Sequence, residues 1–306
     1  MTKHVAVLMG GWSNERPVSL SSGAACVAAL RQAGYAVTEI DVGRDIADVL
    51  QRLRPDVAFN ALRGTLGESG MVQGVLELLA IPYTHSGILA SGLAMDRHRA
   101  KIMFKAAGIP VTDHVILDRA AAARAHAMSP PYVIKRAADG ASFAVLVVRG
   151  DQSYPPQEIL GADWVGGEEI MVERYIPGRE LACAVMGDVA LGVTELVTDP
   201  ASRNSGATRP AGGRRQIIPA QISPNIYEKV QKMSLKAHEV LGCRGVTRSE
   251  FRYNDQAGPD GELVCLEINT QPDMTPASVV LEQARYAGHS VEELVSWMVE
   301  DASCNR

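Results

Sequence analysis

Apolar runs alternate with amphipathic stretches along the first 85 residues. Strand-like runs at 4–9, 36–42 and 56–60 are separated by helical patterns at 17–32 and 45–53. A further helical pattern at 70–79 leads into Pro82-Tyr-Thr, and Ser13 or Asn14 is expected to cap the first helix. This β-α-β-α-β order predicts a parallel sheet with helices on its faces and right-handed crossovers.

From Val111 onward the chain is richer in turns and the expected strands are closer together. These strands are predicted at 113–117, 132–136, 143–148, 170–174, 180–186, 191–197, 245–253 and 262–269. Turns such as Met186-Gly-Asp188 favour antiparallel pairing. Helices are predicted at 88–94, 96–107, 224–241 and 291–301, with a long polar loop at 198–216. The change of pattern places a domain boundary near residues 86–97.

Length and composition exclude several classes of protein. The 306 residues favour two domains, with one or three as alternatives. Hydrophobic residues make up 46% and charged residues 21%, as in ordinary globular proteins, and charges interrupt every apolar run before the length of a membrane span. The N-terminus enters a strand directly without a signal-peptide pattern, so a cytoplasmic location is expected.

Charge and cysteine content narrow the chemistry further. The formal net charge of −5 means that the chain lacks the overall positive charge typical of nucleic-acid-binding proteins. Any phosphate binding must therefore depend on a local group of positive charges. The five cysteines form no C-x-x-C pair, and four lie among apolar or small residues. Buried free thiols are therefore expected, rather than disulfides or a zinc site.

The strongest chemical signal lies in two late strands. Strict alternation in Leu263–Asn269 puts Cys265, Glu267 and Asn269 on one face, and the same spacing pairs Arg248 with Glu250 in the strand before it. Carboxylate and amide oxygens suit Mg²⁺, and such groups are costly to bury without a cation or phosphate. Each strand alone is also compatible with a solvated polar face, but together they favour a metal site.

Two other segments carry candidate ligands. Lys135 ends an apolar strand just before a turn with Gly140 and Ser142, whose backbone N–H groups could bind phosphate; an ordinary hairpin with an edge lysine is the alternative. The Gly10-Gly11 loop opens a helix where α/β proteins bind ligands, but its spacing is not G-x-G-x-x-G, which argues against a dinucleotide. Glu15 follows as either a capping charge or an anchor for a substrate ammonium.

Taken together, these segments resemble the D-alanine:D-alanine ligases of the ATP-grasp superfamily along nearly the whole chain. The matching segments are Met9–Leu20, Leu62–Gly74, Pro82–Gly87, Met95-Asp96, Glu173–Glu180 and Leu266–Pro272. The resemblance implies an α/β and α+β fold, in which a Rossmann-like domain at 1–95 precedes ATP-grasp subdomains at 96–178 and 179–306. It also implies ATP and Mg²⁺ (or Mn²⁺) as cofactors, D-amino acids as substrates, an acylphosphate intermediate, a role in peptidoglycan synthesis and a homodimer.

The resemblance carries roles onto individual residues. Glu15 would hold the first substrate's ammonium, Arg248 the oxyanion of the tetrahedral intermediate, and Ser278 the second carboxylate, while Ser142 belongs to the phosphate loop. Arg97 would contribute to cofactor binding, Lys135 would bind phosphate, Glu180 the ribose, and four consecutive residues the adenine: Glu173, Arg174, Tyr175 and Ile176. The metal set would be Glu250, Glu267 and Asn269.

The sequence departs from the family pattern within these motifs. Arg63 replaces His, Ser69 replaces Asp, Arg97 replaces Lys, Glu250 replaces the metal Asp, and Asp273 replaces Gly. Phe143 and Ala144 alter the phosphate loop, and residues 198–216 contain neither the Lys nor the Tyr of the family's mobile loop. Two functions therefore stay open: a ligase of D-amino acids, with an altered acceptor as one possibility, or a nucleotide-binding paralogue with little or no ligation.

Overall fold

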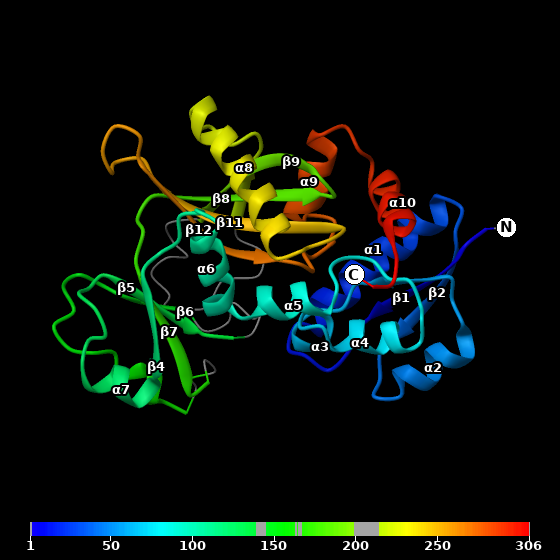
Figure 1. Cartoon of the computed structure of the whole chain (residues 1–306), viewed down its shortest axis with the longest axis horizontal. Coiled ribbons are helices and arrows are strands. Elements are labelled where there is room, and N and C mark those ends of the chain that lie inside the picture. Colours follow the sequence, from blue (N-terminus) through cyan, green and yellow to red (C-terminus); the bar gives the residue numbers. More distant parts are fainter. Residues whose placement is uncertain (1, 139–144, 163, 165–166, 199–213, 306) are drawn as a thin grey trace.

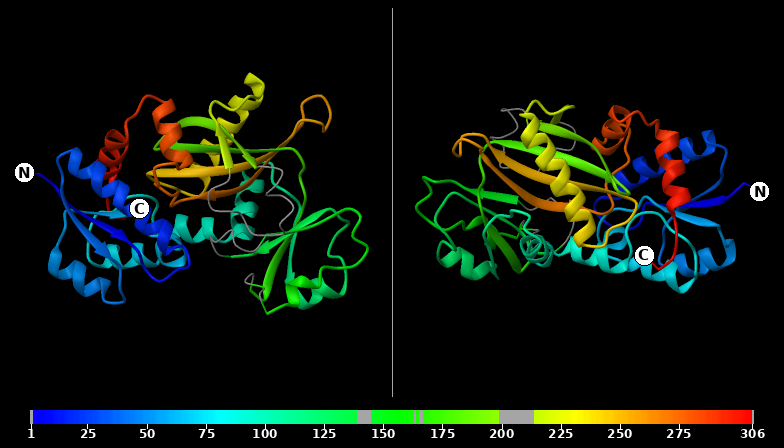
Figure 2. Two further views of the ribbon diagram at one scale, coloured as in Figure 1. Left: turned by 180° about the vertical axis from the view of Figure 1, so that it is seen from behind. Right: turned by 45° about the horizontal axis from the view of Figure 1, so that its top comes forward.

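The structure, a computed structural model, describes residues 2–138, 145–162, 164, 167–198 and 214–305. Three sheets follow one another along the molecule (Figure 1). Figure 2 shows the N-terminal sheet and the four-stranded sheet at opposite ends, with the five-stranded sheet between them. No described helix combines the length and apolarity needed to span a bilayer.

The N-terminal sheet is parallel, as the sequence predicts. Its strands β1 (His4–Met9), β2 (Ala36–Asp41) and β3 (Val57–Asn60) lie in the order β2-β1-β3. Alternate residues of β1 enter different cores: Val5 and Val7 pack on the side of α1 (Arg16–Gln32) and α10 (Val291–Asp301), and Ala6 and Leu8 on that of α2 (Ile46–Leu53) and α4 (Met71–Leu78). Both faces of the sheet are therefore covered.

Details of this region differ from the sequence prediction. The N-cap of α1 is Glu15, and no side chain caps it; the hydroxyl of Ser13 instead accepts the N–H of Glu15 at 3.2 Å. A short helix, α3 (Thr65–Glu68), was not predicted. The Pro82–Thr84 segment contributes a single parallel bridge between Ala58 and Tyr83 rather than a full strand.

The four-stranded sheet is antiparallel, in the order β4-β7-β5-β6. Its strands are β4 (His114–Asp118), β5 (Tyr132–Arg136), β6 (Val145–Val148) and β7 (Glu169–Arg174). One face packs against α7 (Arg119–Arg124) and the short 3-10 helix at Glu158–Leu160, neither of which was predicted. Lys135 and Glu173 alternate with residues of that packed face, so they point to the opposite side of the sheet.

The five-stranded sheet is also antiparallel, in the order β10-β9-β8-β11-β12. Its elements are β8 (Arg179–Met186), β9 (Val189–Thr198), β10 (Arg214–Ile217), β11 (Val246–Asn254), β12 (Glu262–Asn269), α8 (Pro224–Val240) and α9 (Val279–Tyr286). The predicted 198–216 loop is wrong at its end, because residues 214–216 belong to β10; residues 199–213 lie outside the described residues. Helix α9 was not predicted.

A β-bulge corrects the predicted faces of β12. Glu250 pairs with Glu267 but Phe251 pairs with Cys265, so the register skips Leu266. As a result Cys265 packs with Ile268 in one core cluster, whereas strict alternation put it beside Glu267 and Asn269. Glu267 still lies opposite Glu250 in the register.

Two helices connect the N-terminal sheet to the rest of the chain. They are α5 (Ile88–Met95) and α6 (Arg97–Ala106), and α6 contacts both β12 and α8. Although α10 is the last described helix of the chain, it packs on α1 of the N-terminal region. The domain limits 1–95, 96–178 and 179–306 stay a prediction. Four of the five cysteines are buried free thiols, as predicted, and Cys304 is partly exposed.

Candidate active site

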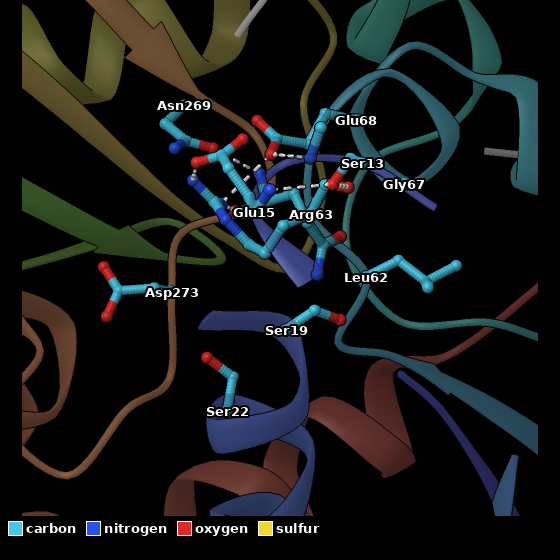
Figure 3. Close-up of polar contacts among 12 residues, drawn as sticks. Ser13, Glu15, Ser19, Ser22, Leu62, Arg63, Gly67, Glu68, Asn269 and Asp273 are labelled. Atoms are coloured by element: carbon cyan, nitrogen blue, oxygen red, sulfur yellow. Dashed lines mark hydrogen bonds and ion pairs between the residues drawn. The ribbon is translucent and has the colours of Figure 1, made fainter. Parts of the chain in front are cut away.

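One cluster of charges forms around Arg63, between the loop after β3 and the start of α1 (Figure 3). The Arg63 guanidinium lies 3.5 Å from Glu15 Oε1 and 3.3 Å from Glu68 Oε1, and it donates to the backbone oxygen of Gln271. Burial by itself lowers the pKa of Arg63, but Glu68 and Glu15 outweigh it and raise that pKa. Arg63 is therefore held as a buried, permanent cation.

Glu15 keeps one oxygen available in this cluster. Its Oε1 faces Arg63, whereas the buried Oε2 has no hydrogen-bond partner among the described residues. A buried carboxylate oxygen without a donor is costly, and such an atom in a native structure calls for an explanation. An ammonium group of a ligand would supply the missing donor.

A second group of charges lies at Arg248 on β11. Its Nη2 donates to Glu250 Oε1 at 2.5 Å, and its Nη1 lies 3.6 Å from Asp273 Oδ2. Asn269 is opposite Arg248 in the sheet, and its side-chain oxygen accepts the N–H of Gln271 at 2.8 Å. The loop after β12 therefore joins this group to the Arg63 cluster.

The predicted metal ligands are brought together. Glu250 and Glu267 face each other on paired strands, and Asn269 ends the same strand as Glu267. Arg97 donates to Glu267 Oε2 at 2.8 Å; burial raises the pKa of Glu267, but this guanidinium outweighs it and lowers the pKa. Glu267 is thus favoured in the ionised form that Mg²⁺ requires.

The donor chemistry of this set fits a hard cation. Two carboxylates and an amide oxygen are oxygen ligands, which Mg²⁺ prefers. The set includes only two acidic residues, and the described part of the chain contains no group of three His, Cys, Asp or Glu side chains that could hold a metal. A pocket lined by Glu68, Arg97, Glu267 and Asn269, among others, opens beside them. In this structure arginines neutralise the carboxylates that a metal would neutralise.

The third group of charges is buried in the four-stranded sheet and α6. Glu173 Oε1 lies 2.7 Å from Lys135 Nζ, and its Oε2 lies 3.0 Å from Lys101 Nζ and accepts from Thr112 at 2.6 Å. Burial raises the pKa of Glu173, but the two lysines outweigh it and hold the pKa well below its usual range. Two cations thus share one carboxylate, which leaves a net positive charge suited to an anion such as phosphate.

The remaining predicted residues surround this group or lie at the far end of the site. Arg174 pairs with Glu262, Ile176 is buried, and Tyr175 donates its N–H to Pro131 O at 3.3 Å. Glu180 lies 4.0 Å from Arg252. Ser278 caps α9 by accepting the N–H of Leu281 at 3.3 Å. Ser142 lies outside the described residues.

The two ends of the site carry opposite charge. Around Arg63 and Arg248, four carboxylates face two guanidinium groups, a formal charge of −2. Around Glu173, one carboxylate faces two ammonium groups, a formal charge of +1. The first end suits ammonium groups and metal cations, and the second suits a phosphate.

The comparisons with known proteins agree with this geometry. The family model described as "D-ala D-ala ligase C-terminus" matches residues 103–300. A D-alanine--D-alanine ligase of Rhizobium meliloti (strain 1021) is 58% identical over 306 residues, covering 100% of this chain and 99% of the relative. This chain belongs to the D-alanine–D-alanine ligase family.

Other members support the same assignment. A D-alanine--D-alanine ligase of Agrobacterium fabrum is 57% identical over 307 residues, covering 99% of each chain. The crystal structure of the Bacillus anthracis ligase complexed with ATP superposes with a TM-score of 0.80 at 26% identity, covering 98% of this chain and 97% of that one. The predicted ATP-grasp fold with an N-terminal α/β domain is therefore confirmed.

Residue-by-residue prediction missed Lys101, Thr112, Glu68 and Gln271. Lys101 could have been found, because helical spacing places it on the face of α6 that also carries Arg97 and Phe104. Glu68 could have been inferred from the need to balance Arg63 in an otherwise apolar run. Gln271 contacts Asn60 and Arg63, which are more than 200 residues away in sequence, and no local pattern signals those contacts.

Proposed function

We propose that this chain is an ATP-dependent D-alanine–D-alanine ligase. The observation that carries the proposal is the full-length similarity to curated ligases, combined with a site whose anionic end suits amino-acid ammonium groups and whose cationic end suits a nucleotide. The reaction phosphorylates the carboxylate of one D-alanine, and the amine of a second displaces phosphate from the acylphosphate to form the peptide bond.

Residues at the nucleotide end are proposed to bind ATP. Lys135 offsets phosphate charge, Arg97 adds a second cation beside Glu267, and residues 173–176 bind the adenine while Glu180 binds the ribose. The net positive charge around Glu173 supports this assignment. Glu250, Glu267 and Asn269 are proposed to hold Mg²⁺, which supplies charge neutralisation for the phosphates.

Residues at the other end are proposed to bind the amino acids. Glu15 would accept the ammonium of the first D-alanine, which its buried, unpartnered Oε2 supports within the described residues. Arg248 would stabilise the oxyanion that forms when the second amine attacks, and Ser278 would bind the second carboxylate. Ser142 keeps its predicted role in the phosphate loop.

The experiment that tests the function measures phosphate release and dipeptide formation with ATP, Mg²⁺ and a panel of D-amino acids. D-alanine-dependent phosphate release with D-alanyl-D-alanine as product is the expected result. ATP binding without turnover with every D-amino acid in the panel would instead identify the nucleotide-binding paralogue. A preferred acceptor other than D-alanine would correct the second substrate only.

The homodimer and the cytoplasmic location are proposed from the family resemblance alone. Sedimentation at micromolar concentration distinguishes a dimer from a monomer of 32.7 kDa. Fractionation of cells that express the chain tests its location.

A further inference from the structure

Asp273 lies close to one guanidinium group of the site and acts electrostatically on a second. Its Oδ2 is 3.6 Å from Arg248 Nη1, and its charge is one of the influences that raise the pKa of Arg63. Its Oδ1 accepts the hydroxyl of Thr275 at 2.7 Å, which fixes the orientation of the carboxylate. About a quarter of the side chain is exposed to solvent.

Arg248 already has a carboxylate partner without Asp273. Glu250 binds Nη2 at 2.5 Å, and Arg248 Nε has no hydrogen-bond partner in the described part of the chain. One guanidinium is therefore shared by two carboxylates, and the local formal charge is −1. An anion that forms near Arg248 meets a weaker positive potential than a guanidinium with one partner would provide.

We propose that Asp273 restrains the ligation step by competing for Arg248, so that it is a positioning residue that acts through this guanidinium. The inference rests on the proposed function, because it concerns the oxyanion of the ligase reaction. When the second amine attacks the acylphosphate carbon, a C–N bond forms and the carbonyl electron pair moves to oxygen. The amine then releases a proton, and the carbonyl re-forms as the C–O bond to the departing inorganic phosphate breaks. The carboxylate of Asp273 opposes the negative charge of that intermediate.

The same carboxylate has a compensating role in the folded protein. Arg63 brings a positive charge into a buried position, and Asp273 is one of the carboxylates that favour it, after Glu68 and Glu15. Asp273 therefore stabilises a buried cation while it weakens a nearby one in catalysis. Such opposing effects on stability and activity are common at functional sites.

The test compares Asp273→Asn with the wild-type chain by two measurements. The first is calorimetric binding of a D-alanine dipeptide analogue whose phosphinate oxygen anion stands in for the oxyanion, with ADP and Mg²⁺ present. The second is the single-turnover rate of D-alanyl-D-alanine formation. We expect Asp273→Asn to bind the phosphinate roughly tenfold more tightly and to ligate roughly tenfold faster. The product D-alanyl-D-alanine has a neutral peptide carbonyl in place of the phosphinate anion. Its affinity and the KM for ATP should therefore stay within about twofold of the wild-type values.

Three further variants make the result specific. Asp273→Glu keeps the charge and should bind the phosphinate as the wild type does. Asp273→Gly introduces the residue usual in the family and should also bind the phosphinate more tightly than the wild type. It takes the place of Asp273→Asn if Asp273→Asn folds poorly. Asp260→Asn is the matched control, because Asp260 is exposed in the turn between β11 and β12.

The outcomes separate this inference from the proposed function. Phosphinate binding by Asp273→Asn or Asp273→Gly that is unchanged or weaker, in a wild type that makes the dipeptide, overturns the role of Asp273. A wild type that makes no dipeptide overturns the proposed function instead. Equal tightening of phosphinate and product would assign Asp273 to general substrate binding and would also overturn the inference.

Discussion

The two ends of the site are built in different ways. At the nucleotide end, Lys135 and Glu173 lie on paired strands and Lys101 on one helix, so regular backbone geometry sets their separations. At the amino-acid end, Arg63 and Asp273 lie in loops that follow β3 and β12. The first end has a simple excess of positive charge, whereas the second, which also includes Arg248 and Glu250 of β11, balances several charges against one another. Substitutions should therefore act locally at the first end and spread through the network at the second.

The largest expected effect is at the amino-acid end. Glu15→Gln removes the carboxylate proposed for the first ammonium, and kcat/KM for D-alanine should fall about 100- to 1,000-fold. Steady-state kinetics at saturating ATP measures it, with the exposed, surface-paired Glu39→Gln as the control. A change below threefold would show that the unpartnered Oε2 does not bind substrate.

The next effect tests the nucleotide end. Lys135→Ala removes one of two cations around Glu173, and the affinity for ATP should fall about 10- to 100-fold because the phosphate loses its nearest charge. Calorimetry measures the dissociation constant, and Lys105→Ala on the exposed side of α6 is the control. Unchanged affinity for ATP would refute the placement of Lys135.

A smaller effect should appear in stability. Lys101 is buried and paired with Glu173, so Lys101→Met should lower the free energy of unfolding by about 1–3 kcal/mol. This loss is smaller than that expected when a buried ion pair is broken completely, because Lys135 and Thr112 still contact the carboxylate. Urea unfolding measures it. Lys105→Met serves as the control, and a loss as small as that of the control would contradict the structural role of Lys101.

The smallest effect is a pH dependence. The folded-state pKa of Glu173 lies below its ordinary value of 4.5, so the unfolded chain binds more protons and this residue's stabilising contribution is lost as pH falls below about 4.5. Between pH 5 and pH 3, unfolding free energies of the wild type should therefore fall more steeply than those of Glu173→Gln. Glu168→Gln, at an exposed residue, should follow the wild type. Parallel curves for all three would exclude the lowered pKa.

Much of the fold could be predicted because its signals are local. The strands and helices of the N-terminal sheet follow from hydrophobic periods of 2 and 3.6, and their order predicts the parallel pairing that the structure has. Helices α3 and α7 were missed because four and six residues give too little periodicity, whereas α9, as long as the predicted α2, was missed without such a reason. The β-bulge at Glu250 was missed because alternation assumes a regular register.

The candidate site was predicted in part for the same reason. Glu267 and Asn269 lie two residues apart on one strand, so their shared face follows from local geometry. The pairing of Arg63 with Glu15 depends on how the loop after β3 meets the start of α1, and that of Arg248 with Asp273 on how the loop after β12 lies against β11. The sequence identifies Arg63 as a replacement of the family's His, but it does not indicate which residues Arg63 contacts. Only the structure supplies those partners.

The sequence by itself determined the family and the class of each sheet, because these depend on local patterns and ordered motifs, and it named the candidate residues that we propose bind ATP, Mg²⁺ and amino acids. The tertiary structure decided which charges balance one another: that Lys101 shares Glu173 with Lys135, and that Asp273 shares Arg248 with Glu250. Electrostatic interactions depend on distance in space rather than distance along the chain, so no reading of the chain alone could assign those partners.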